Sequence, residues 1–279
     1  MNEKVIKSEN VAVITGAARG IGAAAAREFA HQGMKLCLFD RDREALQVLA
    51  DELDTEITLV IGDVTREEDL RQLHKTAYST YGKVNLLFNN AGAKVAAGAC
   101  DSPDRWRHQM AVNLTSIVAT QHLFLPEMLK MKERGAVVNL GSKEGITTPP
   151  GFAAYNASKA AVKVLTEQLS HQLLMDTGSR LTAHLLVPGY TWTAMNDPGM
   201  DERKGIKPDE AWTAAQVIDY FVPRFEHGDF YIICPDNAVS CGTDAKRILW
   251  ACQDMLENRP ALSRWHPDWK DDFERWLKR

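Results

Sequence analysis

The sequence of 279 residues lacks the features that mark secreted, membrane-spanning and disulfide-stabilised proteins. No run of about 18 consecutive apolar residues occurs, which excludes a transmembrane helix of ordinary length. Residues 1–10 are polar and charged, so we expect no secretory signal. The five cysteines are scattered, odd in number and never spaced as CxxC, so neither a disulfide framework nor a zinc site is indicated. We therefore expect reduced thiols and a cytoplasmic location.

A surplus of basic charge is also missing. The 33 Lys and Arg residues face 37 Asp and Glu residues, and the formal net charge is −4. A mildly acidic chain without a basic block is a poor partner for nucleic acid or an anionic membrane, so we expect neither as a partner. The eight histidines form no metal-like cluster, and no metal is expected.

Short apolar runs alternate with longer stretches of helical periodicity. The strand candidates are Val11–Thr15, Lys35–Phe39, Ile57–Ile61, Val84–Phe88, Ala136–Leu140, Leu181–Val187 and Phe230–Ile233. Strands that are apolar on both faces are typical of parallel strands covered by helices on both sides. No internal repeat or Pro/Ser-rich linker divides the chain. We predict an α/β fold with a doubly wound, Rossmann-like, seven-stranded parallel sheet, forming a single domain over residues 1–250.

A glycine-rich turn follows the first predicted strand and leads into an alanine-rich helix. Glycines in such a turn let the backbone approach a pyrophosphate, and the free N–H groups of the helix N-terminus attract the anion. The context of strand, turn and helix near the N-terminus favours a dinucleotide site over a purely local role for the glycines. The cofactor-binding candidates in this turn are Gly16, Arg19, Gly20, Ile21 and Gly22.

Two carboxylates at strand ends indicate which coenzyme, NAD or NADP, would bind. Asp40 ends the second strand, where it would accept hydrogen bonds from ribose hydroxyls and repel a 2′-phosphate. Asp63 follows the third strand, where an adenine amino group would lie. Arg19 and Arg41 argue the other way, because either would pair with a 2′-phosphate. We predict NAD, with NADP as the alternative.

Tyr155 and Lys159 lie four residues apart at the start of a predicted helix, on one face of it. A nearby ammonium favours the phenolate and lowers the pKa of a tyrosine, which suits it to exchange protons near neutral pH. Ser142 follows the fifth strand and faces the crevice where open α/β sheets bind ligands. The combination predicts catalysis, although Ser142 alone is also a common turn residue.

The chain resembles the short-chain dehydrogenase/reductase family, in its single-domain form. The resemblance covers residues 11 to about 235 and rests on several motifs in the family's order. These are Thr15–Gly22, Asp63-Val64, Asn89-Asn90-Ala91-Gly92, Asn113, Ser142, Tyr155 with Lys159, and Pro188-Gly189 followed by Thr191 and Thr193.

This resemblance implies catalytic roles. Tyr155 would be the general acid/base, and Lys159 would lower its pKa and hold the nicotinamide ribose. Ser142 would position the substrate oxygen. Asn113 would support a water that links Lys159 to solvent, unless it is an ordinary helix residue. The further cofactor contacts that the family implies are Asp63, Val64, Asn90, Ala91, Gly92, Pro188, Gly189, Thr191 and Thr193. Thr191 occupies a place that is usually apolar in the family.

Substrate specificity is expected from loops at the carboxyl ends of the strands. The substrate-binding candidates are Val95, Ser142, Phe152, Tyr155, Trp192 and Met195. They indicate a hydrophobic or aromatic secondary alcohol or ketone, although Trp192 and Met195 would equally serve to pack the loop 190–208, interpreted as a lid, onto the body. Lys94 and Lys143 leave room for an anionic substituent.

The predicted function is hydride transfer between a nicotinamide coenzyme and such a substrate. Two other functions compete: a cofactor-sensing regulator without turnover, and a nucleotide-sugar epimerase or dehydratase. The intact Ser142, Tyr155 and Lys159 set speaks against the first, and the form of the glycine turn speaks against the second. We expect a homodimer or homotetramer, with the dimer formed through the helices that bear Asn113 and Tyr155.

Residues 251–279 exceed the family's single domain and are predicted to form a C-terminal extension. Four of the seven tryptophans lie in the last 30 residues of the chain: Trp250, Trp265, Trp269 and Trp276. Large apolar side chains should not remain in water. We expect them to pack on the lid or on a neighbouring subunit, or else on the back of the sheet.

Overall fold

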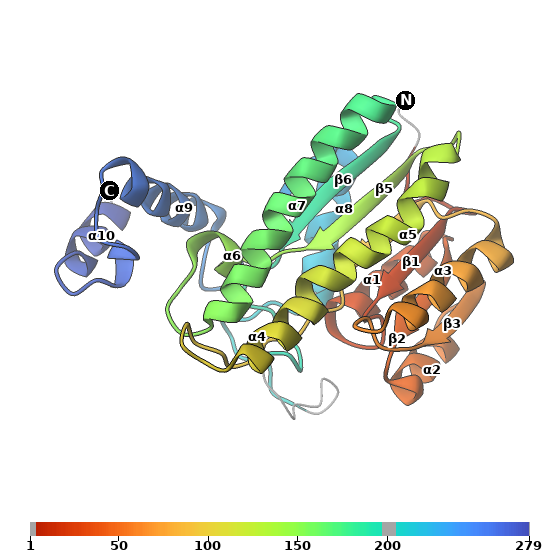
Figure 1. Ribbon diagram of the computed structural model, residues 1–279, viewed down its shortest axis with the longest axis horizontal. Helices are drawn as coiled ribbons and strands as arrows, with labels where there is room; N and C mark the ends of the chain where they lie inside the picture. Colours follow the sequence, from red (N-terminus) through yellow and green to blue (C-terminus); the bar gives the residue numbers. More distant parts are fainter. Residues whose placement is uncertain (1–3, 197–204, 279) are drawn as a thin grey trace.

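Apolar strands at the centre of the chain pair into one parallel sheet. The computed structural model describes residues 4–196 and 205–278. Its seven strands lie in the order β3-β2-β1-β4-β5-β6-β7 (Figure 1). They are β1 (Val11–Thr15), β2 (Lys35–Asp40), β3 (Ile57–Ile61), β4 (Leu86–Asn89), β5 (Gly135–Leu140), β6 (Leu181–Val187) and β7 (Tyr231–Ile233). The doubly wound parallel sheet predicted from the sequence is confirmed.

Helices cover both faces of this sheet. The helices of the body are α1 (Gly20–His31), α2 (Arg43–Asp51), α3 (Glu67–Tyr81), α4 (Pro103–Met110), α5 (Ser116–Lys130), α6 (Glu144–Thr147), α7 (Ala153–Thr177) and α8 (Ala214–His227). A π-helical turn, Ala111–Thr115, separates α4 from α5. One core joins the strands to α1, α2 and α8, and a second joins them to α3, α5 and α7. The sheet is therefore the middle of three layers.

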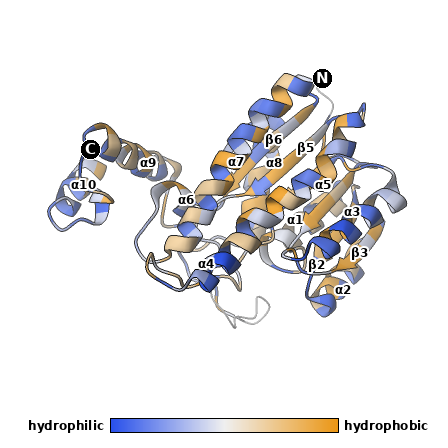
Figure 2. Ribbon diagram, in the orientation of Figure 1, coloured by the Kyte–Doolittle hydropathy of each residue, from blue (hydrophilic) through white to orange (hydrophobic). Residues whose placement is uncertain are grey.

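Alternation along β1 shows how the two cores are separated. Ala12 and Ile14 enter the core of α1, α2 and α8, whereas Val13 enters the other. All three are fully buried. Figure 2 shows the strands as predominantly hydrophobic and the outer helix surfaces as hydrophilic. Because both faces are covered, the residues of the central strands β1, β4 and β5 are buried, which is why these strands read as continuous apolar runs.

The order of the strands reverses between β1 and β4, which pair with each other in the middle of the sheet. In open α/β sheets the ligand crevice lies at such a reversal, outside the carboxyl ends of the strands. β4 begins at Leu86 rather than at the predicted Val84, because the Asn85 side chain accepts the Val11 N–H at 3.0 Å.

The C-terminal residues form an arm of their own. It consists of α9 (Cys241–Leu256), a 3-10 turn (Ser263–Trp265) and α10 (Lys270–Leu277). In Figure 1 this arm projects from the end of the body where α6 lies. The predicted boundary between residues 250 and 251 falls inside α9.

The aromatic side chains of the arm pack against one another. The Trp250 ring lies 5.4 Å from the Phe273 ring and 5.3 Å from the Trp276 ring, centre to centre. The Trp250 indole N–H donates to Ser263 Oγ at 2.7 Å, and the Arg259 guanidinium stacks 4.0 Å above the Trp250 ring. Trp250 is thus buried inside the arm. The expectation that the tryptophans pack on the lid or on the back of the sheet is wrong for Trp250 and Trp276.

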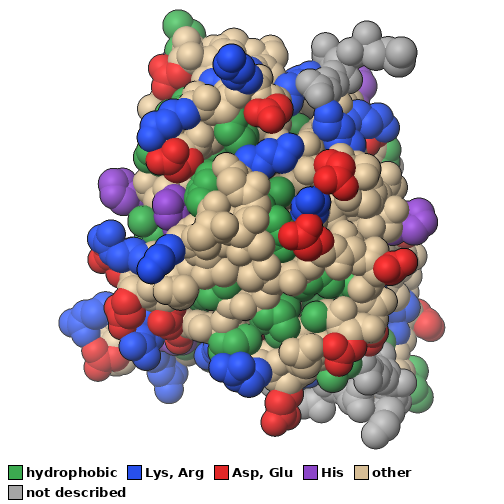
Figure 3. All heavy atoms as spheres, turned by 90° about the vertical axis from the view of Figure 1, so that its right-hand side faces the viewer, with side chains coloured by type: hydrophobic (Ala, Val, Ile, Leu, Met, Phe, Trp, Pro, Cys, Tyr) green, Lys and Arg blue, Asp and Glu red, His purple; other side chains and the backbone are tan. Residues whose placement is uncertain are grey.

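The surface carries both signs of charge. On the face in Figure 3, Lys and Arg side chains lie among Asp and Glu side chains rather than in one basic area. In the described part of the chain, no helix combines the length and the apolar composition needed to cross a bilayer.

Candidate active site

The glycine turn between β1 and α1 depends on one very close backbone approach. A Cβ atom on Gly22 would lie 2.1 Å from the Gly16 carbonyl oxygen, so only glycine fits there. The first turn of α1, with Gly20, Ile21 and Gly22, has no side-chain cap. Its N–H groups therefore stay available to an anion, as the sequence predicts.

Asp40 lies at the end of β2, beside this turn. Its Oδ2 accepts the Ala18 N–H at 3.0 Å, and its Oδ1 accepts the Asp42 N–H at 3.0 Å. The carboxylate therefore holds the glycine turn as well as facing the crevice. Arg19 forms an ion pair with Asp42 at 2.5 Å. Hydrogen bonds from Ala45 N–H and Arg19 keep the pKa of Asp42 below its usual range.

The segments after β3 and β4 complete this side of the crevice. Asp63 is fixed in a local turn, since its Oδ1 accepts both the N–H and the hydroxyl of Thr65 at 2.8 Å. Val64 follows it and packs at the edge of the α3 core. The Asn90 amide donates to the carbonyl oxygens of Thr15 and Gly16, at 3.0 and 2.8 Å. Asn90 thus joins the end of β4 to the glycine turn.

Two amide side chains fasten the loop that follows Ala91 and Gly92. Asn113, fully buried in the π-helical turn, accepts the Ala93 N–H at 2.8 Å and donates to the Ala93 carbonyl at 3.0 Å. Gln109 donates to the same carbonyl and accepts the Val95 N–H, both at 2.7 Å. π-Helical turns are frequent at functional sites. The sequence singled out Asn113 but missed Gln109, whose only signal is its place four residues earlier.

Asn113 also reaches the helix that carries Tyr155. Its amide donates to Ser158 Oγ at 3.1 Å, and that hydroxyl donates to the Tyr155 carbonyl at 2.7 Å. A chain of buried hydrogen bonds therefore runs from the loop after β4 to the first turn of α7. Such a chain fixes the position of α7 relative to the loop.

Tyr155, Lys159 and Ser142 come together as predicted. Tyr155 is 7% exposed and Lys159 is 2% exposed. Lys159 Nζ lies 5.9 Å from the centre of the Tyr155 ring and donates to the Leu140 carbonyl at 2.7 Å. Gly145 of α6 lies so close to Lys159 that a Cβ there would be 2.5 Å from the Lys159 carbonyl carbon. This close approach places Ser142, at the end of β5, beside α7.

Burial controls the acidity of this group. It raises the pKa of Tyr155 to about 12, a hydrogen bond with Ser142 opposes the rise, and the Glu144 carboxylate adds to it. Burial also lowers the pKa of Lys159 to about 8. The sequence predicts that Lys159 lowers the pKa of Tyr155. In the structure the lysine points to Leu140, and removal of the phenol from water is the larger effect.

An ion pair that the sequence did not reveal lies next to Tyr155. Lys94 Nζ is 2.6 Å from Glu144 Oε1. The same amino group lies 4.5 Å above the centre of the Phe152 ring and 5.2 Å from that of Tyr155. Phe152 is 38% exposed. Lys94 and Glu144 are 50 positions apart, so no local motif announces their contact.

Residues of the segment after β6 lie on both sides of the crevice. Met195 reaches the loop after β4, where its Cε would lie 3.3 Å from a Cβ on Gly92. Trp192 instead lines a hollow between α1 and α8, and its backbone N–H donates to the Trp212 carbonyl at 2.8 Å. This placement favours the packing role for Trp192. Residues 197–204 of the predicted lid lie outside the described residues.

The remaining candidates of this segment are held by backbone contacts. Thr191 is buried, and its hydroxyl donates to the carbonyl of Gly189, the residue after Pro188, at 3.2 Å. Thr193 accepts the Asn196 N–H through its carbonyl at 2.9 Å. Pro188 and Gly189 thus begin a tight turn outside β6, next to the carboxyl end of β5.

Lys143 is fully engaged with two carboxylates. Its Nζ lies 2.6 Å from Asp244 Oδ2, in α9, and 3.4 Å from Asp236 Oδ2, after β7. All three side chains are largely buried. Burial raises the pKa of Asp244 above its ordinary value, and Lys143 opposes that rise. The anion site expected at Lys143 is therefore occupied by the protein's own carboxylates, and the C-terminal arm is tied to the residue next to Ser142.

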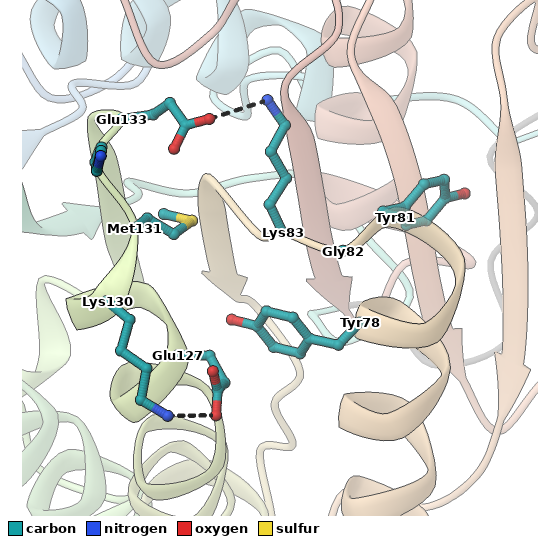
Figure 4. Close-up of a pocket in the computed structure, with 9 residues that line it drawn as sticks. Tyr78, Tyr81, Gly82, Lys83, Glu127, Lys130, Met131 and Glu133 are labelled. Carbon is teal, nitrogen blue, oxygen red and sulfur yellow. Dashed lines mark hydrogen bonds and ion pairs between the residues drawn. The ribbon is translucent and has the colours of Figure 1, made fainter.

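Another hollow lies at the opposite, amino-terminal end of the strands (Figure 4). Four of its charged side chains form two ion pairs: Lys83 with Glu133 at 4.0 Å, and Lys130 with Glu127 at 2.9 Å. Within residues 4–196 and 205–278, no group of three or more His, Cys, Asp or Glu side chains is arranged to hold a metal. The candidate site is thus the crevice at the carboxyl ends.

Comparison with known proteins agrees with this geometry. The family model of the short chain dehydrogenases matches residues 10–204. An uncharacterized oxidoreductase of Staphylococcus aureus (strain USA300) is 31% identical over 225 residues, which cover 80% of this chain and 94% of the relative. One of Staphylococcus epidermidis (strain ATCC 35984) is 31% identical over 222 residues, covering 78% and 93%.

A solved structure is also similar. It is a short chain dehydrogenase/reductase from Burkholderia phymatum in complex with NAD, with a TM-score of 0.81 and 29% identity over 92% of this chain and 97% of that one. Sheet order, glycine turn and family match converge: this chain belongs to the short-chain dehydrogenase/reductase family of oxidoreductases.

Proposed function

We propose that this protein is an NAD-dependent oxidoreductase that interconverts a secondary alcohol and a ketone, with Tyr155 as the general acid/base. The observation that carries the proposal is the buried group of Tyr155, Lys159 and Ser142 at the carboxyl end of β5. A buried phenol next to a buried amine is costly to keep unless it serves a purpose.

The coenzyme would lie along the carboxyl ends of β1 and β2. The uncapped first turn of α1 and the close approach at Gly22 fit a pyrophosphate. Asp40 would accept ribose hydroxyls, and Arg19 is engaged with Asp42, so the residues favour NAD over NADP. Asp63 and Val64 would face the adenine. Asn90, Ala91 and Gly92 would border the ribose, and Pro188, Gly189, Thr191 and Thr193 the nicotinamide.

The nicotinamide supplies the hydride acceptor or donor, and the chain's own residues handle the proton. Ser142 would hold the substrate oxygen against Tyr155 Oη, and Tyr155 would exchange one proton with that oxygen. Lys159 would bind the nicotinamide ribose, and Asn113 would position α7 through Ser158. Val95, Phe152 and Met195 would form apolar walls for a hydrophobic or aromatic substrate, whereas Trp192 would support the coenzyme side.

We further propose a cytoplasmic homodimer or homotetramer. Val118, on the helix α5 that follows the π-helical turn, is 46% exposed. Val164, on the helix α7 that carries Tyr155, is 53% exposed. Exposed apolar side chains on these helices would be buried between two copies of the chain.

Tyr155→Phe tests the proposal. We expect kcat to fall by roughly 10³-fold, because the variant lacks the proton that is exchanged with the substrate oxygen. Binding of NADH, followed by fluorescence, should change little. Tyr231→Phe, at a half-exposed tyrosine on β7, is the control and should keep wild-type kcat. If Tyr155→Phe instead loses NADH binding with kcat unchanged when saturated, the tyrosine is structural. If the wild type turns over no alcohol or ketone with either coenzyme, the regulator without turnover becomes the better function.

The two directions of the reaction should differ in how their rates depend on pH. Because burial raises the pKa of Tyr155 to about 12, the phenol is protonated and ready to donate at neutral pH. Ketone reduction should therefore change little between about pH 6 and 8, whereas alcohol oxidation, which needs the deprotonated group, should rise with pH. Initial rates in both directions across this range measure the effect, and an oxidation rate that falls as the pH rises would contradict it.

A further inference from the structure

We propose that Lys94 and Glu144 form a polar subsite that binds a second, uncharged oxygen of the substrate, so that the preferred substrate is a hydroxyketone or a diol. This inference rests on the proposed function and names its substrate class more narrowly. It starts from the placement of the ion pair: the Lys94 amino group lies 5.2 Å from the centre of the Tyr155 ring, closer than that of Lys159 at 5.9 Å.

The subsite is held rigidly from both ends. Lys94 stands between Ala93 and Val95, whose backbone groups are bound by Asn113 and Gln109 at 2.7 to 3.0 Å. On the other side, the Glu144 N–H donates to Ser142 Oγ at 3.2 Å. Neither partner therefore depends on a free loop for its position. A preorganised pair of this kind can select a substrate by geometry.

The pair is also left partly unsatisfied. Glu144 Oε1 accepts from Lys94, but Glu144 Oε2 is buried and has no hydrogen-bond partner among the described residues. A buried carboxylate oxygen without a donor is costly, and a ligand group that donates a hydrogen bond would remove the cost. The Lys94 ammonium group has three N–H donors and uses one in its hydrogen bond to Glu144. The subsite thus offers an acceptor and a donor side by side.

The balance of charge indicates which ligand fits. A carboxylate or phosphate near Lys94 would meet the negative charge of Glu144 at close range, and a cation would meet Lys94. A hydroxyl group does neither, because it accepts from Lys94 Nζ through its oxygen and donates its own proton to Glu144 Oε2. Lys143, the other lysine of this region, is occupied by Asp236 and Asp244. The apolar Phe152 ring beneath Lys94 would cover the carbon atoms between the two oxygens.

The test compares matched substrates. Wild-type kcat/KM is measured with 3-hydroxy-2-butanone and with 2-butanone, which lacks only the second oxygen. We expect a preference of at least ~100-fold for the hydroxyketone, because a site with buried polar groups rejects an analogue that leaves them unpaired. Lys94→Met and Glu144→Gln should each lower this ratio at least ~10-fold. The control is Lys130→Met, which removes an exposed lysine at the opposite end of the sheet and should keep the wild-type ratio.

Three outcomes would overturn the inference. The first is an equal kcat/KM for the two ketones in the wild type. The second is a preference for acetoacetate, whose carboxylate would show that Lys94 acts as an anion site. The third is a loss in both variants that is the same for both ketones and accompanied by a lower melting temperature, which would mean that the pair only holds the loop on α6. In each case turnover itself persists, so the proposed function stands. Absence of turnover with every alcohol and ketone would instead refute the proposed function.

Discussion

The two sides of the crevice are built differently. On the side of β1 and β2, the backbone makes the site: glycines without side chains, the free N–H groups of α1, and the Asp40 carboxylate that holds the turn. On the other side, formed by the loop after β4 and the ends of β5 to β7, side chains from distant segments make it, through Lys94 with Glu144 and Lys143 with Asp236 and Asp244. The first side therefore depends on backbone geometry and on glycine, whereas the second depends on a few side chains that substitutions can change.

The largest effect is expected where the backbone approach is closest. Gly22→Ala places a Cβ 2.1 Å from the Gly16 carbonyl oxygen, which forces the glycine turn open. We expect NADH affinity, measured by calorimetry, to fall at least ~100-fold because the N–H groups of α1 no longer converge on the pyrophosphate. Gly242→Ala is the control, since a Cβ there would meet only Ser240 Oγ, at an ordinary contact distance of 3.8 Å, and alanine forms helix better than glycine does. Near-wild-type affinity in Gly22→Ala would show that the first side is more tolerant than its geometry indicates.

A large effect on stability is expected on the second side. Lys143→Met leaves Asp236 and Asp244 buried without their cation, and we expect a loss of about 3 kcal/mol in the free energy of unfolding, measured with urea. Asp244→Asn is the matched variant and should cost much less, because Lys143 keeps Asp236 as its partner.

The Lys143→Met defect should also depend on pH. Burial raises the pKa of Asp244, so the folded protein binds a proton at this group more readily than the unfolded chain does. Acidification therefore favours the folded state at this carboxyl, and the defect should shrink as the pH is lowered from about 8 to about 5. A defect that grows on acidification would contradict this assignment.

This difference also explains what the sequence could predict. The glycine turn, Asp40, and the strands that end at them are encoded by neighbouring residues, so spacing and periodicity were enough. Tyr155 and Lys159 share one helix face, and they too were predictable. Lys94 with Glu144 and Lys143 with Asp244 join segments that only the folded sheet brings together, and each lysine alone looks like an ordinary surface residue. Burial, rather than the lysine neighbour, has the largest effect on the pKa of Tyr155, and burial depends on the whole fold rather than on local spacing.

A smaller effect is expected on the preference between NAD and NADP. Asp40→Asn removes the negative charge and retains one of the two side-chain acceptors that hold the turn. We expect the ratio of kcat/KM for NADP to that for NAD to rise at least ~10-fold, because repulsion of a 2′-phosphate is removed. Asp51→Asn, on the exposed end of α2, should leave this ratio unchanged. A wild type that already prefers NADP would make the coenzyme proposal wrong.

The smallest effect on catalysis is expected from the core of the arm. Trp250→Ala removes the ring that contacts Phe273, Trp276 and Arg259. We expect faster proteolytic cleavage within residues 251–279, because the arm has its own small core, while the urea midpoint of the body stays within error. A smaller oligomeric state than that of the wild type in gel filtration, or a raised KM, would instead show that the arm contacts a neighbouring subunit. Leu249→Ala, at a half-exposed position of α9, is the control for cleavage.

The π-helical turn at Ala111–Thr115 limits how this chain can change in length. One residue corresponds to about 100° of rotation around a helix axis. Deletion of a single residue from this turn would swing either Asn113 or the whole of α5 away from its partners, whereas a surface loop would absorb the same deletion. The turn therefore fixes the rotation of this long helical segment about its axis. At one end it points Asn113 at the loop after β4, and at the other it points the apolar face of α5 at the sheet.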